Sequence, residues 1–71
     1  MPLNDVSYDL LSILQSKLDA VAIYEQYIED AQEAGNGQVA QLFEQIKQQD
    51  EQAADRLANA LEQMVKSGQF H

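Results

Sequence analysis

The sequence contains no cysteine and only one histidine, so the residues that most often build compact metal and redox sites are almost missing. The lack of cysteine excludes a disulfide staple and a Cys/His zinc cluster. Bases are also scarce: four lysines and arginines stand against twelve acids, which gives a net charge of −8. This balance argues against nucleic acids and anionic membrane surfaces as partners, because both require a basic footprint.

Long apolar runs are absent as well. None approaches the length of a membrane span or of a signal-peptide core, so we expect a cytoplasmic protein with no membrane partner. With one proline and three glycines, the sequence also offers few helix breakers. The strongest breaker is Gly35-Asn36-Gly37, which suits a left-handed helix C-cap followed by a tight reversal.

Apolar residues recur at helical spacing on both sides of this breaker, and no segment alternates with the period of a strand. The pattern predicts one all-α domain over residues 1–71, with a helix over about 8–34, a turn at 35–37 and a helix over about 38–67. Residues 1–7 are expected to form a short arm with helix-capping residues, and 67–71 a frayed tail that ends in an idle His71. So short a turn makes the two helices antiparallel neighbours.

Two helices packed against each other have no enclosed interior, because each apolar stripe covers only part of the other. The apolar fraction of 45% nevertheless favours a folded chain over a disordered one. We therefore expect a homodimer or higher homo-oligomer, in which two hairpins form a four-helix bundle.

A charge interrupts each apolar stripe. The first stripe contains Lys17 and the second contains Asp50; the apolar members are Leu10, Leu14, Leu18, Val21, Tyr24 and Ile28 in the first, and Val39, Leu42 or Phe43, Ile46, Ala53, Leu57, Leu61 and Met64 in the second. A charge that faces a core is costly unless it is paired. Lys17 and Asp50 lie about 7 Å apart along the hairpin axis, within reach of a lysine side chain. We predict an ion pair between them, lined by Ala53 and Tyr24.

Other polar residues are weaker candidates. Glu25 and Lys47 lie at matching distances from the turn and are expected to form a rim pair of little energetic weight. Asp50 and Glu51 are adjacent, so on a regular helix they point about 100° apart and cannot share an inward metal site. Tyr27, like Tyr24, is expected to fill the core rather than to relay electrons or protons beside a metal.

The residues around the two interruptions resemble a known family. Lys17-Leu18-Asp19-Ala20-Val21-Ala22-Ile23-Tyr24-Glu25-Gln26, with Asp30-Ala31 after it, is similar to the first metal-site helix of ferritin-like proteins, in particular the short two-helix encapsulated ferritins. Asp50-Glu51-Gln52-Ala53-Ala54, followed by Leu57, resembles the second motif of that family, Glu-x-x-His-Ala.

The resemblance implies a ferritin-like four-helix bundle built by dimerisation. It also implies iron ligands at three positions, namely Glu at the place of Lys17, Glu at that of Asp50 and His at that of Ala53. This sequence departs from the family at all three, while the matching tyrosine, Tyr24, is kept. Since an ammonium group cannot ligate iron, the resemblance carries over the fold but not the ferroxidase activity.

Three functions follow from these observations. The leading one is a non-enzymatic, metal-free, self-associating helical domain with a structural or interaction role, in which Lys17 substitutes for the lost cation beside Asp50. The second is a di-iron or other divalent-metal protein that uses Glu25, Asp50 and Glu51 after rearrangement. The third is an acidic helical adaptor that binds a partner protein.

Overall fold

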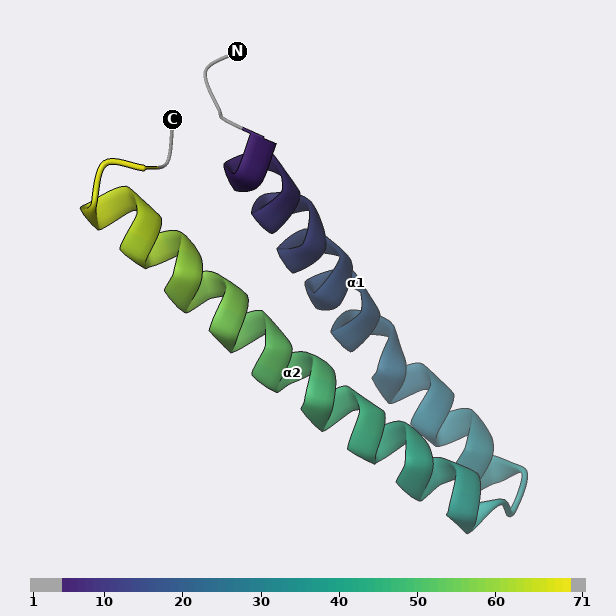
Figure 1. Ribbon diagram of the computed structural model, residues 1–71. Helices are drawn as coiled ribbons and strands as arrows, with labels where there is room; N and C mark the ends of the chain where they lie inside the picture. Colours follow the sequence, from purple (N-terminus) through teal and green to yellow (C-terminus); the bar gives the residue numbers. More distant parts are fainter. Residues whose placement is uncertain (1–4, 70–71) are drawn as a thin grey trace.

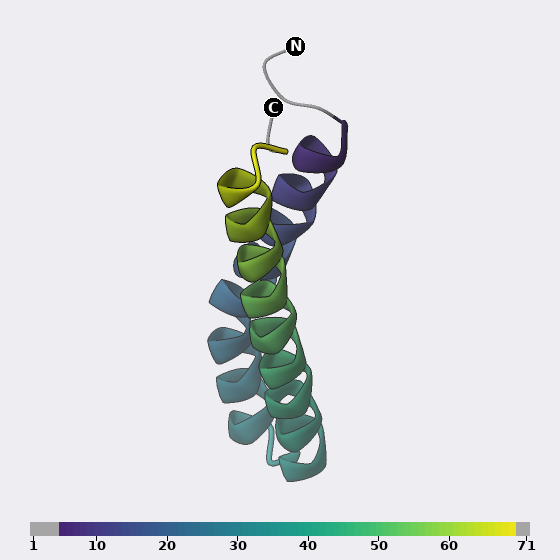
Figure 2. The same ribbon diagram turned by 60° about the vertical axis from the view of Figure 1, so that its left-hand side comes forward.

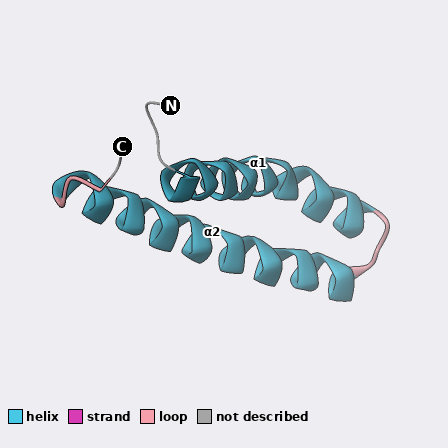
Figure 3. Ribbon diagram, turned by 45° about the horizontal axis from the view of Figure 1, so that its top comes forward, coloured by secondary structure: helices cyan, strands magenta, loops and turns pink. Residues whose placement is uncertain are grey.

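The computed structural model describes residues 5–69 as two long helices joined by a short turn. Helix α1 spans Asp5–Glu33 and helix α2 spans Gly37–Lys66. The helices run antiparallel, so the start of α1 and the end of α2 lie at the same end of the hairpin (Figure 1). The predicted all-α hairpin is confirmed. Among the described residues, only helix and short connecting loop are present, as Figure 3 shows.

Helix α1 begins three residues before the predicted start at Tyr8, so the expectation of a non-helical arm is wrong for residues 5–7. Asp5 lies in the first turn, where a carboxylate interacts favourably with the helix dipole, and no breaker separates it from Tyr8. Ser7, expected as a capping residue, is instead a buried member of the helix. The remainder of the predicted arm, residues 1–4, and the tail residue His71 lie outside the described residues.

The turn closes in the way that the Gly-Asn-Gly sequence predicts. The amide of Asn36 donates to the carbonyl of Ala31 at 2.9 Å, and the amide of Gly35 donates to that of Gln32 at 3.0 Å. These two bonds form a Schellman motif, which needs a residue with positive φ, and Gly35 supplies it at 73°. The side chain of Asn36 then caps α2 by accepting from the amide of Val39 at 3.1 Å.

The best-packed part of the hairpin lies next to this turn. Ile28, Ala31 and Ala40 form the buried cluster, and Tyr24, Val39 and Phe43 pack against it. Towards the free ends the small residues Ser7 and Ala54 are buried. The large inward residues there are only half-buried; these are Leu10, Leu14, Leu57, Leu61 and Met64. Seen from the side, the two helices cross rather than run strictly in line (Figure 2).

The inward face of α1 follows a seven-residue repeat, which is typical of coiled coils. Its members are Ser7, Leu10, Leu14, Lys17, Val21, Tyr24, Ile28 and Ala31. Lys17 therefore takes an inward position, and its neighbour Leu18, predicted to lie in the stripe, is 50% exposed. Leu42 in α2 is also 50% exposed, and Phe43 takes the inward position instead.

The molecule is long and exposes much of its surface. Its accessible area of 5183 Å² exceeds the roughly 4,450 Å² expected for a folded monomer of 8.0 kDa. Its radius of gyration is 15.9 Å, against about 11 Å for a compact domain of this length. Neither α1 nor α2 has a stretch that is both long and apolar enough to cross a bilayer.

Candidate functional site

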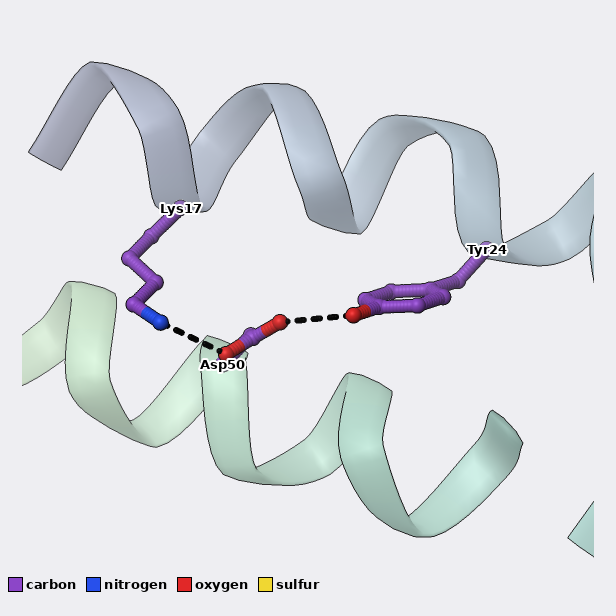
Figure 4. A network of polar contacts seen from close by, with 3 residues as sticks. All are labelled: Lys17, Tyr24 and Asp50. Atoms are coloured by element: carbon purple, nitrogen blue, oxygen red, sulfur yellow. Dashed lines mark hydrogen bonds and ion pairs between the residues drawn. The ribbon is translucent and has the colours of Figure 1, made fainter. Parts of the chain in front are cut away.

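A three-residue polar network links the two helices across the apolar interface (Figure 4). The ammonium of Lys17 donates to Oδ1 of Asp50, with 3.1 Å between Nζ and Oδ1. The hydroxyl of Tyr24 donates to the other carboxylate oxygen, Oδ2, at 2.9 Å. Lys17 and Asp50 thus form the ion pair that the sequence predicts.

The geometry of the network follows from helix periodicity. Lys17 and Tyr24 are seven residues apart on α1, so they lie two turns apart on the same face. Asp50 on α2 lies at a level between them, and its two oxygens point in opposite directions along the helix axis (Figure 4). The network lies near the middle of both helices: Lys17 and Asp50 are within about two residues of the midpoints of α1 and α2, and Tyr24 is five residues from the midpoint of α1.

Within the network, the charge of the more buried carboxylate is balanced by a more exposed ammonium group. The side chain of Asp50 is only 14% exposed, whereas that of Lys17 is 38% exposed and reaches the surface. The Lys17 ammonium and the Tyr24 hydroxyl both hold the pKa of the Asp50 carboxyl below its ordinary value, against the opposing effect of burial. The hydrogen bond to Asp50, followed by partial burial, raises the pKa of the Tyr24 hydroxyl.

These shifts define what the network can do chemically. Asp50 stays ionised and Tyr24 stays protonated at neutral pH, because the hydrogen bond between them stabilises the charged carboxylate and the neutral phenol. A tyrosine held in its protonated form is not primed as a base or a nucleophile, and both oxygens of the carboxylate are already engaged. The arrangement is therefore suited to joining the helices in one register rather than to acid–base work.

Tyr24 has a larger role in the network than its sequence pattern predicts. It was expected only to line the ion pair, but it donates the second hydrogen bond to Asp50. The signal that could have revealed this contact is the seven-residue spacing from Lys17, which places both side chains on one face. Ala53, the other predicted lining residue, is half-buried one turn beyond Asp50 and offers no ligand atom.

The alternative metal ligands are not brought together. Glu25 is bound to Lys47 at the edge of the hairpin, Asp50 is bound within the network, and Glu51 is exposed. Over residues 5–69, no group of three or more Asp, Glu, His or Cys side chains is arranged to hold a metal ion. A di-iron site also does not fit positions 17, 50 and 53, because their donor set is one ammonium, one engaged carboxylate and one methyl group.

The predicted rim pair between Glu25 and Lys47 is present. The hydrogen bond to Glu25 raises the pKa of Lys47 despite the partial loss of its hydration. The carboxylate side of this pair is largely exposed, at 68%, so solvent screens the interaction and its contribution to stability is small.

Comparisons with protein-family models, with curated proteins and with solved structures give no match for this chain. The likeness of residues 17–31 and 50–57 to ferritin-like helices stays a prediction from sequence.

Proposed function

We propose that this protein is a non-enzymatic, metal-free helical module that self-associates and has a structural role. In this proposal two hairpins combine into a four-helix bundle, with the Lys17–Asp50–Tyr24 network fixing how the helices meet. The observation that carries the proposal is that both oxygens of the nearly buried Asp50 are taken, one by an ammonium and one by a phenol.

Charge balance supports the absence of a metal. A buried carboxylate requires a compensating positive charge, and a divalent cation commonly supplies it. Here the Lys17 ammonium lies 3.1 Å from Asp50 Oδ1 and supplies the charge from within the chain. A metal ion at the same place would have to displace Lys17 and would then lie beside a second positive charge.

The small core supports self-association. Among the described residues, the buried apolar side chains are Ile28 and three alanines, Ala31, Ala40 and Ala54. Eight large hydrophobic side chains are exposed, among them Val6, Ile13, Leu18 and Tyr27. Val6, Ile13 and Tyr27 are spaced at multiples of seven residues along α1, and an aligned set of exposed apolar side chains marks a surface that another molecule covers.

The ferritin-like resemblance adds a second line of support. Lys17 and Asp50, which contact each other across the hairpin, are two of the positions at which the resemblance implies metal ligands. Exchanging one carboxylate for a lysine keeps such a site neutral without metal. We therefore propose a ferritin-like bundle in which an internal ion pair replaces the metal centre.

Elemental analysis of the purified protein, with thermal melting in the presence and absence of Fe²⁺ and Zn²⁺, tests this function. We expect no stoichiometric metal and an unchanged melting temperature. A bound metal, or a melting temperature that climbs with metal concentration, would overturn the metal-free assignment.

A gain-of-function variant tests the converse. Lys17→Glu with Asp50→Glu and Ala53→His restores the residues that the resemblance implies, and it should create metal binding. A matched control makes the same three exchanges at exposed positions with the same Asp-x-x-Ala spacing: Lys66→Glu, Asp55→Glu and Ala58→His. The control should bind no metal tightly, and equal binding by both variants would contradict the assignment of positions 17, 50 and 53.

A partner protein is the competing occupant of the exposed apolar surface. The two possibilities differ in mass, because self-association doubles the mass of the purified chain whereas an adaptor without its partner stays monomeric. A monomer at all concentrations would favour the adaptor.

A further inference from the structure

One face of α1 carries an apolar stripe that the hairpin covers only in part. Val6, Ile13, Ala20 and Tyr27 follow one another at intervals of seven, so they fall on one line along α1, and Ala34 continues the spacing one residue beyond the end of the helix. None of the five is buried; Val6, Ile13 and Tyr27 are 62%, 50% and 44% exposed. The stripe contains no charged or hydrogen-bonding side chain other than the Tyr27 hydroxyl.

Contacts near the turn show on which side of the hairpin this stripe lies. The ring of Tyr27 packs edge-on against Tyr24 at 6.5 Å between centroids, and also against Phe43 at 6.3 Å. Tyr27, Ala34, Val39 and Phe43 line a shallow groove of about 460 Å³, whose lining also includes Asp30 and Asn36. The stripe therefore lies along the side of the hairpin from which the Tyr24 side chain reaches Asp50.

The other side of the hairpin differs in character. Near the turn it carries the Glu25–Lys47 pair and a smaller groove, of about 270 Å³, whose lining includes Gln32 and Glu44. Its exposed apolar residue on α1, Leu18, lies towards the free ends. Because polar groups occupy its turn half, this side does not present a continuous apolar line.

The stripe is symmetric about Ala20. Ile13 and Tyr27 lie seven residues on either side of it, and Val6 and Ala34 lie fourteen residues on either side. If a second α1 runs antiparallel along this line, Ala20 meets Ala20, Ile13 meets Tyr27 and Val6 meets Ala34. The smallest side chain then lies at the crossing point, where two helix backbones approach most closely.

We infer that a second copy of this chain packs on this face, with α1 antiparallel to the partner's α1 and a two-fold axis passing beside Ala20. The inference rests on the proposed self-association and adds its surface and register. Ala20 lies one residue from the middle of α1, so the axis also passes the polar network, with Lys17 on one side and Tyr24 on the other.

The exposed area is sufficient for such an interface. The chain exposes about 700 Å² more than a compact monomer of its mass. A stable dimer of standard size buries about 800 Å² from each partner. Covering one face of the hairpin therefore lowers its accessible area to about that of a compact monomer of the same mass.

Cysteine cross-linking tests the axis directly, because the natural chain has no cysteine. Ala20→Cys should form a disulfide-linked dimer under mild oxidation, since a disulfide requires Cβ atoms within about 4.5 Å of each other and the two copies of a residue beside the two-fold axis approach most closely. Ala22→Cys is the matched control: it lies two residues away on the same helix, is exposed and points to the other side. We expect at least a tenfold faster cross-linking rate for Ala20→Cys.

Two further variants test whether the dimer forms on this face of α1 or on the opposite one. Ile13→Gln and Leu18→Gln replace equally exposed aliphatic side chains on opposite sides of α1. We expect Ile13→Gln to raise the dissociation constant of the dimer at least tenfold and Leu18→Gln to change it less than threefold. A mixture of Ile13→Cys and Tyr27→Cys chains should also give the mixed disulfide in preference to either symmetric one.

The possible failures are distinguishable. A chain that stays monomeric at all concentrations overturns both the proposed self-association and this interface. A dimer that Leu18→Gln dissociates, and that Ala20→Cys does not cross-link, overturns the interface alone.

Discussion

The two halves of the hairpin differ in how far they bury their own inward residues. Next to the turn, Ile28, Ala31 and Ala40 are buried, and the chain reversal satisfies its own backbone groups. Towards the free ends, the inward leucines stay half-exposed although they are larger and more numerous. The turn half therefore buries its own apolar residues, and under the proposed self-association a second chain covers the half near the free ends. The polar network lies at the boundary between them.

The sharpest test of this difference is a large-to-small substitution in each half. Ile28→Ala should cost about 2–5 kcal/mol of unfolding free energy, because Ile28 is 6% exposed and its removal leaves a cavity. Leu57→Ala should cost less in dilute protein. Urea unfolding at several protein concentrations measures both. The difference between the losses of unfolding free energy in the two variants should narrow as protein concentration rises and a partner covers Leu57. A larger loss for Leu57→Ala than for Ile28→Ala at all concentrations would contradict the proposed difference between the two halves.

The next largest effect is expected at the boundary itself. Lys17→Met leaves Asp50 without its counter-charge and should lower the melting temperature more than Lys17→Met combined with Asp50→Leu, which removes both charges. Thermal melting of the two variants checks this order. Lys66→Met is the matched control, since Lys66 forms a largely exposed pair with Glu62 and its removal should change the melting temperature little. Equal losses in the single and double variants would count against Lys17 as a built-in cation.

Tyr24→Phe should give a smaller loss of melting temperature than Lys17→Met, because Asp50 keeps its counter-charge and loses one hydrogen bond. The pKa of the Asp50 carboxyl should rise towards its ordinary value, which an NMR titration of the carboxyl carbon measures. Tyr27→Phe removes a hydroxyl from a neighbouring ring and should leave that pKa unchanged. The same shift in both variants would contradict a direct Tyr24–Asp50 contact.

The pH dependence of stability follows from the directions of two pKa shifts. The pKa of Asp50 is lowered on folding, so its stabilising contribution is complete above the unfolded value, about 3.9, and is lost as pH falls through the lower folded value. The pKa of Tyr24 is raised, so its contribution is complete below about 10 and is lost as pH rises through the folded value. Asp50→Asn should flatten both limbs of a plot of urea midpoint against pH. Unchanged limbs would argue against the network.

The smallest effect is expected on the solvent-exposed edge. Glu25→Gln removes one partner of the Glu25–Lys47 pair and should lower the melting temperature only slightly. The difference from the natural chain should vanish in high salt, because ions screen an exposed pair. A loss as large as that of Lys17→Met would show that the edge stabilises the hairpin as much as the network does.

Periodicity was sufficient to predict most of this architecture from sequence. Gly35-Asn36-Gly37 predicts the turn because only a residue tolerant of positive φ closes a Schellman motif there. The charges that interrupt the two apolar stripes predict the Lys17–Asp50 contact, because a charge on the inward face requires an oppositely charged partner. Leu18 was misplaced because a period of 3.6 and a period of 3.5 diverge along a long helix, and packing against α2 follows the shorter one.

The start of α1 and the role of Tyr24 could not be predicted from periodicity. Asp5 and Ser7 are equally good caps and first-turn residues, so composition alone does not fix the end of the helix. A tyrosine at an inward position fills space in most helices, and only the level of Asp50 on the facing helix makes it a hydrogen-bond donor.

Native mass spectrometry of the purified protein gives the most direct test, because one spectrum reports both the number of chains and any bound metal. We expect an assembly of twice the 8.0 kDa chain mass, or a higher even multiple, with no added metal mass. A species that carries stoichiometric metal, or a monomer at every concentration measured, would contradict a hairpin that pairs with its own copy around an internal lysine–aspartate bond.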